Sequence, residues 1–139
     1  MKSRSDIYEK SILLIRILVG WVFLSEGIQK FLFPATLGVG RFAKIGIPVP
    51  QVMAPFVGGV EIAFGVLILI GLFTRLATLP LLIDIVVALF TTKLPFLVRH
   101  GIWGALHEAR TDLSMLLGLI FLLIVGGGSL ALDAKLRSR

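Results

Sequence analysis

The sequence contains no cysteine, only two histidines and a single tyrosine. A chain without cysteine forms no disulfide, performs no thiol redox chemistry, and binds neither a cysteine-ligated iron–sulfur cluster nor a thioether-linked haem. Any redox role therefore needs an electron carrier that the chain does not itself provide. Charged residues are also scarce at 16%, whereas hydrophobic residues make up 57% and the mean hydropathy is +1.00. This composition predicts an integral membrane protein, with residues 1–139 forming one domain.

Four apolar stretches are each long enough to cross a bilayer, which takes roughly 20 residues. We expect helices at 11–33, 52–73, 76–98 and 108–132. The predicted fold class is therefore all-α, an integral membrane four-helix bundle. Four spans place both termini on the same side. Basic residues are slightly more numerous toward that side, so the positive-inside rule predicts that both termini are cytoplasmic.

The first span carries charges and glycines on one face. At about 100° per residue, Arg16, Gly20, Gly27 and Lys30 share a stripe of that helix. Ionisable groups inside a bilayer are costly, and glycine lets a neighbouring helix approach closely. We therefore expect this stripe to contact protein rather than lipid.

Depth along the helices predicts two groups of charges. At about 1.5 Å per residue, Arg16 and Asp84 lie at similar distances from the inner boundary, and we expect them to form a structural ion pair. Glu26, Lys30 and Glu61 lie at similar depths from the outer boundary, where we expect a polar cluster. This cluster fits either a structural ion network that sets helix register or a ligand pocket.

A quinone headgroup is one ligand that would suit such a pocket, because its two carbonyl oxygens need donors near the membrane surface. Lys30, Gln29 or His107 could donate to them, while Glu61 or Glu108 exchanges protons.

The segment 99–112 is the most polar part of the interior sequence, and it includes both histidines, Glu108 and Asp112. We expect it to form the mouth of a site. His100 and His107 lack a carboxylate cluster at ligand spacing, so the sequence predicts no metal site. The basic residues form no stripe or nucleic-acid motif, and no nucleic-acid partner is expected.

Several motifs resemble the DoxX family of small four-helix bacterial membrane proteins. Arg16 and Gly20 followed by FLSEGIQKF resemble its first-helix pattern, and VGGVEIAFGVLILIGLFTR resembles its second block. HEARTDLSMLLGLIFLLIVGGG resembles the fourth-helix entry of a subgroup, and GGGSLALD resembles the terminal signature. Ala131 stands where that signature often has serine, so no role for a hydroxyl carries over.

This resemblance implies a four-helix fold in the bacterial cytoplasmic (inner) membrane. It also implies a link to quinone-coupled oxidation of sulfur compounds and to membrane oxidoreductase assemblies, with quinone rather than a metal or haem as the cofactor. The partners it implies are lipid, soluble or membrane oxidoreductase subunits, and possible further copies of the chain. A family label does not by itself establish a mechanism.

Residues and resemblance together favour a membrane subunit or partner of a quinone-linked oxidoreductase system. The candidate catalytic residues are Glu61, Glu108 and His107, and the candidate ligand-binding residues are Glu26, Gln29, Lys30 and Asp112. Two alternatives stay open. The buried charges could serve as a relay in a small-solute or proton transporter, or the chain could be a non-catalytic anchor that recruits soluble enzymes.

Overall fold

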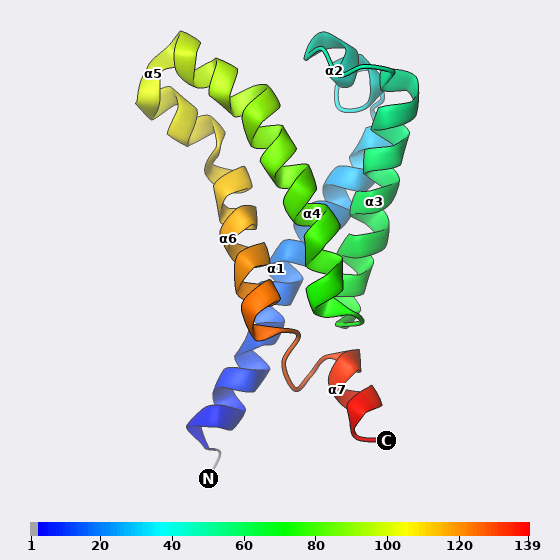
Figure 1. Ribbon diagram of the computed structural model, residues 1–139, viewed down its shortest axis with the longest axis vertical. Coiled ribbons are helices and arrows are strands. Elements are labelled where there is room, and N and C mark those ends of the chain that lie inside the picture. Colours follow the sequence, from blue (N-terminus) through cyan, green and yellow to red (C-terminus); the bar gives the residue numbers. More distant parts are fainter. Residues whose placement is uncertain (1–2) are drawn as a thin grey trace.

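The computed structural model describes residues 3–139, and the polypeptide is helical over most of this range (Figure 1). Its elements are α1 (Arg4–Leu32), α2 (Val39–Lys44), α3 (Pro50–Ile70), α4 (Thr74–Ala88), the π-helix η1 (Leu89–Lys93), α5 (Leu94–Glu108), α6 (Arg110–Val125) and α7 (Leu132–Arg137). Helices α1, α3, α4 and α6 pack into a bundle. The predicted all-α membrane bundle is confirmed.

Three helical stretches in the described chain are long and apolar enough to cross a membrane: Arg4–Leu32, Pro50–Ile70 and Thr74–Glu108. The third is bent, because Gly101 has φ 77° and ψ 178°, a backbone conformation that favours glycine. The chain turns back there, and residues 102–108 and α6 form a return limb that brings it to the end where both termini lie (Figure 1).

The helix boundaries differ from the predicted ones at this return. The predicted helices left residues 99–107 as a connection, but these residues belong to α5, which runs to Glu108 with a reversal at Gly101. The last helix of the bundle ends at Val125 and not at residue 132. Gly126 and Gly128 both have positive φ there, which takes the chain out of the helical conformation.

Glycines join α1 to α3, as the stripe on the first helix predicted. A Cβ on Gly27 would lie 2.7 Å from the carbonyl oxygen of Gly58, and one on Gly20 would lie 2.9 Å from that of Gly65. Real side chains do not fit in these spaces, so the two backbones can approach this closely only at glycine. The prediction that this face contacts protein is confirmed.

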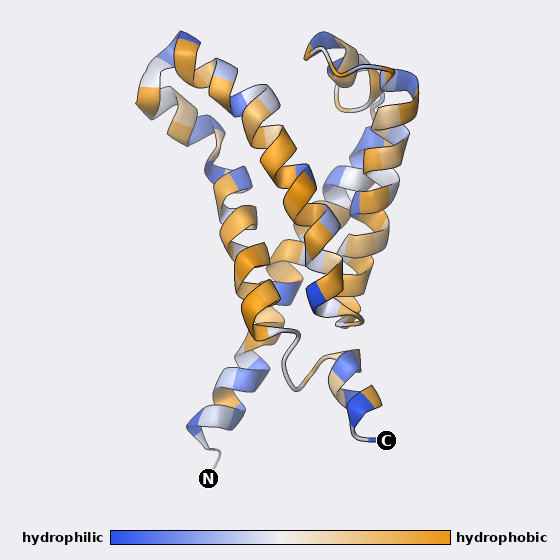
Figure 2. Cartoon of the chain, viewed as in Figure 1, coloured by the Kyte–Doolittle hydropathy of each residue, from blue (hydrophilic) through white to orange (hydrophobic). Residues whose placement is uncertain are grey.

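The apolar core lies in the part of the bundle nearer the termini. It consists of Ile12, Val19, Phe23, Ile68, Ala77, Leu81, Ile85, Met115, Leu119 and Leu122. Many large apolar side chains are also exposed on the outside of the helices. Figure 2 shows that the helices are mainly hydrophobic between their more polar ends. Leu14, Ile83 and Ile124, for example, are 67–70% exposed. A surface of this kind suits lipid and not water.

Candidate functional site

Lys30 and Glu61 form a buried ion pair between α1 and α3. The Nζ atom of Lys30 lies 2.7 Å from Oε2 of Glu61, and the two side chains are 12% and 6% exposed. The close approach of the helices at Gly27 and Gly58 brings these residues together. The structure thus unites two members of the predicted outer cluster.

Asp84 of α4 belongs to the same group of charges. Its carboxyl lies near that of Glu61 and within electrostatic reach of Lys30 and of Asp112 on α6. This part of the bundle therefore holds a carboxyl pair beside one ammonium group.

The predicted ion pair between Arg16 and Asp84 is wrong. Arg16 is 1% exposed and donates to three backbone carbonyls: Nε to Ile68 at 3.0 Å, Nη2 to Leu69 at 2.6 Å and Nη1 to Gly127 at 3.4 Å. The last carbonyls of a helix lack partners within that helix, so the end of α3 attracts the guanidinium. Asp84 lies ten residues into α4, about 15 Å deeper.

Lys93 in η1 forms ion pairs with two carboxylates, toward the end of the bundle opposite the termini. Its Nζ atom lies 3.4 Å from Oε1 of Glu108 and 3.2 Å from Oδ2 of Asp112. The π-helix occurs just before Pro95, which has no N–H to donate to the carbonyl of Thr91. Sequence reasoning missed Lys93, although a lone lysine in an apolar stretch that is interrupted by proline was a visible signal.

Three other candidates do not join these ion pairs. Glu26 is exposed, and only its backbone carbonyl is near Lys30 Nζ, at 3.5 Å. The amide of Gln29 donates to the hydroxyl of Ser25 at 2.9 Å. His107 is exposed, and its carbonyl accepts a hydrogen bond from Arg110. The predicted cluster therefore contains Lys30 and Glu61 but not the carboxylate of Glu26.

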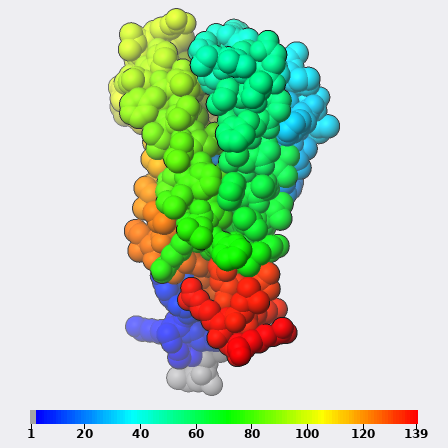
Figure 3. Space-filling model, turned by 45° about the vertical axis from the view of Figure 1, so that its right-hand side comes forward, coloured from blue at the N-terminus to red at the C-terminus, as the bar shows by residue number. Residues whose placement is uncertain are grey.

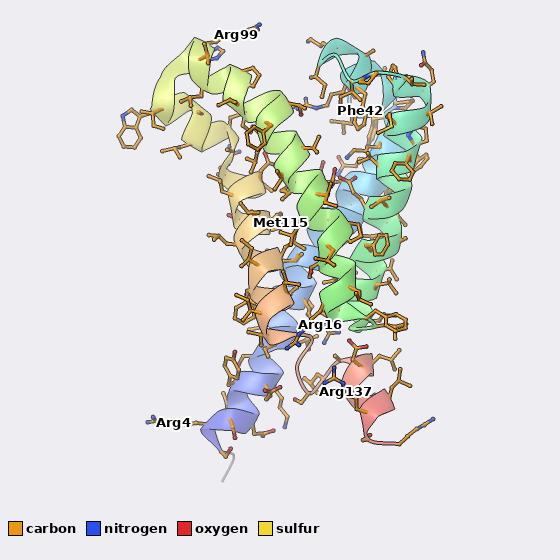
Figure 4. All side chains as sticks on the ribbon, viewed as in Figure 1. Arg4, Arg16, Phe42, Arg99, Met115 and Arg137 are labelled. Atoms are coloured by element: carbon orange, nitrogen blue, oxygen red, sulfur yellow. The ribbon has the colours of Figure 1, made fainter. Side chains whose placement is uncertain are left out.

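A cleft of about 670 Å³ opens between α2 and the η1–α5 segment, at the end opposite the termini. Figure 4 shows Arg99 at this end and Arg16 near the other. The charged residues that line the cleft are Arg41, Lys44, Lys93, Arg99 and Glu108. The cleft is thus mainly basic, and the paired side chains of Lys93 and Glu108 both line it.

An apolar groove of about 310 Å³ lies next to the cleft, between η1 with the first part of α5 and the return limb. It is lined by Leu89, Phe90, Lys93, Leu94, Leu97, Ile102, Ala105, Leu106 and Ala109. Lys93 is the only charged residue in the groove, and it also lines the cleft. One ammonium group therefore stands where an apolar and a polar cavity meet.

At the terminal end, Asp133 ties the C-terminal segment to the start of α4. Its Oδ1 accepts the N–H of Phe73 at 2.8 Å, and its Oδ2 accepts the N–H and hydroxyl of Thr74 at 3.0 and 3.1 Å. Figure 3 shows the C-terminal residues, in red, against the ends of the green helices. Burial opposes ionisation of Asp133, but these hydrogen bonds outweigh it and lower its pKa.

Metal-binding chemistry finds no support among residues 3–139. No group of three or more His, Cys, Asp or Glu side chains in this range is placed to hold an ion. His100 stacks on Phe96, with ring centroids 4.1 Å apart. The side-chain contacts at the site are ion pairs.

Known proteins place the chain in a family. Residues 11–94 match the DoxX family profile. The chain is 56% identical to an uncharacterized membrane protein of Mycobacterium tuberculosis, over 93% of this chain and 83% of that protein. It is 32% identical to the "Putative oxidoreductase CatD" of Bacillus subtilis, over 91% of this chain and 87% of that protein. It is 34% identical to an uncharacterized protein of Haemophilus influenzae, over 87% of each chain. No solved structure matches. The chain belongs to the DoxX family.

Proposed function

We propose that this protein is a membrane subunit or partner of a quinone-linked oxidoreductase system, and that the quinone binds in the apolar groove beside Lys93. The observation that carries this proposal is the junction at Lys93, where an apolar groove meets a polar cleft. An amphiphile with an apolar tail and a polar ring end has both surfaces to contact there. The name of the Bacillus subtilis relative supports the oxidoreductase class.

The residues present fit a quinone better at Lys93 than at the predicted donors. Lys30 is already paired with Glu61, and Gln29 already donates to Ser25. Neither residue lines the cleft or the apolar groove, and His107 does not line them either. Lys93 has three N–H donors, so it can keep its two carboxylate partners and still donate to a ligand oxygen.

The chain's own residues would then bind the ring and handle protons. Leu94, Leu97 and Leu106 would contact the apolar part, and Lys93 would orient one carbonyl oxygen. Glu108, which is 45% exposed and pairs with Lys93, would exchange protons with water in the cleft. A bound quinone would supply the electron-accepting chemistry. The donor would be a partner subunit, because the chain has no cysteine to ligate an iron–sulfur cluster.

Both termini lie at one end of the molecule, and we propose that this end faces the bacterial cytoplasm. The cleft would then open on the outer face of the cytoplasmic membrane, where an external donor could reach it. Reporter fusions at the two termini give the orientation directly.

The test is the rise in melting temperature that a short-chain quinone causes in detergent-solubilised protein. Leu106 is 44% exposed in the groove, so Leu106→Trp should fill the groove without disturbing the core and abolish the rise. Val98 is 83% exposed on the same helix and lines no described cavity, so Val98→Trp is the matched control and should keep the rise. Lys93→Met, which has no N–H donor, should weaken quinone binding roughly tenfold, the effect of losing one hydrogen bond to a charged group.

An equal rise in wild type and all three variants would remove the groove from the proposal. Absence of any rise, combined with soluble enzymes that copurify from native membranes, would instead favour the non-catalytic anchor.

A further inference from the structure

The cleft of about 670 Å³ carries cations on both of its walls. Arg41 and Lys44 come from α2, and Arg99 comes from α5 on the opposite wall. Arg41 and Lys44 are three residues apart, so their side chains are neighbours on the surface of α2. Figure 4 labels Arg99 on one arm of the bundle and Phe42 of α2 on the other. Two arms that are far apart in sequence thus bring positive charge to one space.

Three of these cations have no acidic partner. Within residues 3–139, no carboxylate forms an ion pair with Arg41, Lys44 or Arg99. Lys93, the fourth cation of the lining, pairs with Glu108, the one acidic residue of the lining, and with a carboxylate of α6. Lys93 and its partners carry one excess negative charge against three positive ones. The cleft therefore has two net positive charges for a ligand to neutralise.

A phosphate group suits this charge and these donors. A phosphate monoester carries about −1.5 to −2 charges near neutral pH. A guanidinium presents N–H donors in a planar fork that matches two phosphate oxygens at once. Thr91 and Thr92 also line the cleft, but their hydroxyls donate to the carbonyls of Val87 and Ala88 at 2.8 and 2.6 Å. The cations are thus the donors left for a ligand.

The packing of each wall holds the cations in place. On α2, Phe42 is 7% exposed, and the N–H of Gly40 donates to the carbonyl of Pro34 at 2.9 Å. A side chain at Gly40 would overlap the carbonyl oxygen of Ala35, so this turn is tightly packed. On the other wall, the ion pairs of Lys93 tie η1 to α5 and α6. A ligand therefore has little backbone to order when it binds.

The cleft lies at the level where a membrane meets water. Helix α2 is part of the connection between the membrane helices α1 and α3, and Arg99 comes two residues before the reversal at Gly101. Trp103, just after the reversal, is 81% exposed, and tryptophan is enriched at membrane–water interfaces. Dissolved phosphate esters and phospholipid headgroups both reach this depth, and basic pockets between membrane helices bind such headgroups.

We propose that the cleft is a phosphate-binding site, in which Arg41 and Lys44 contact the phosphate from α2 and Arg99 contacts it from α5. The phosphate belongs either to a dissolved ester or to a phospholipid headgroup. Because its ligands come from both walls, bound phosphate joins the two arms of the bundle across their open side. This site is separate from the quinone groove, since none of the three cations lines that groove.

The test is the melting temperature of the protein in an uncharged detergent. One arm compares glycerol phosphate with sodium chloride at equal ionic strength. The other compares phosphatidic acid, whose headgroup is a phosphate monoester, with phosphatidylcholine. A larger rise with glycerol phosphate than with chloride would identify a dissolved ester as the ligand. A rise with phosphatidic acid alone would identify a lipid headgroup, and the absence of both rises would overturn the proposal.

Two double variants separate the cleft from general charge attraction. Arg41→Gln/Arg99→Gln removes one cation from each wall and should weaken phosphate binding roughly a hundredfold, about tenfold for each lost charged partner. Arg4→Gln/Lys135→Gln is the matched control, because it removes the same charge from exposed positions outside the cleft and should bind like wild type. Equal binding by both double variants would contradict a site in the cleft.

The single variants test whether both walls take part. Arg41→Gln and Arg99→Gln should each weaken binding, and an effect of only one of them would contradict a phosphate held between the arms. Neither change alters a residue of the apolar groove, so the rise caused by a short-chain quinone should persist in both. A wild type that responds to quinone but not to phosphate would overturn this inference alone. The opposite result would overturn only the quinone proposal.

Discussion

Arg16 and Lys30 are both largely buried cations of α1, and they differ in what surrounds them. Arg16, near the termini, donates to the carbonyls of Ile68, Leu69 and Gly127. Lys30, toward the cleft, pairs with the carboxylate of Glu61 at 2.7 Å. Backbone partners cannot titrate, whereas carboxyl partners can. The terminal end is therefore built to hold its charge in place, and the cleft end can change its charge.

The same contrast extends to the elements around each cation. Near the termini, Arg16 and Asp133 tie α1, the α3–α4 turn and the C-terminal segment together through backbone groups. Toward the cleft, Lys30 pairs with Glu61, and Lys93, which lines two cavities, pairs with carboxylates of α5 and α6. Hydrogen bonds to backbone groups suit a structural role, whereas titratable side chains beside cavities suit a functional site.

The largest effect should come from Arg16→Ala. This change leaves a cavity and three carbonyls without their donor, and we expect a loss of about 3–5 kcal/mol in the free energy of unfolding. Arg16→Lys should recover little of this stability, because one ammonium group cannot reproduce the planar guanidinium with its several N–H donors. Denaturant unfolding in detergent measures both. A mild effect of Arg16→Ala would end the distinction between the two regions.

Lys30→Met should cost less, about 2 kcal/mol, because Glu61 can take up a proton when its cation is lost, whereas the three backbone carbonyls that bind Arg16 cannot. The double variant Lys30→Met/Glu61→Gln should be milder than the sum of the two single variants, since it leaves no lone charge. A double-mutant cycle in the same unfolding assay measures this coupling. Strict additivity would show that the pair contributes nothing.

Asp133→Asn should have the smallest effect, about 1 kcal/mol, which is typical of a lost helix cap. The folded-state pKa of Asp133 is lowered, so its contribution is present above the unfolded-state pKa and disappears as pH falls through the folded-state value. Wild type should therefore lose its advantage over Asp133→Asn on acidification below about pH 4. Melting curves across this range test the sign, and a difference that grows on acidification would contradict it.

The sequence by itself determined the membrane class, the all-α fold and the face on which α1 contacts α3. These follow from hydropathy and helical periodicity, which are local properties. Gly20 and Gly27 appear on one stripe because they are seven residues apart, and any helix would place them so. The family followed from motifs that are also contiguous in sequence.

Only the tertiary structure decided which charges meet. The depth of each residue along its helix, estimated from the sequence, paired Arg16 with Asp84. That estimate did not include the carbonyls at the end of α3, which lack partners within the helix and accept hydrogen bonds from Arg16. Nor could it show that the chain reverses at Gly101, which brings Glu108 and Asp112 back beside Lys93. Contacts between residues on different helices depend on where each helix ends and how it turns, and a single glycine conformation or a π-helical turn can shift them by several ångströms.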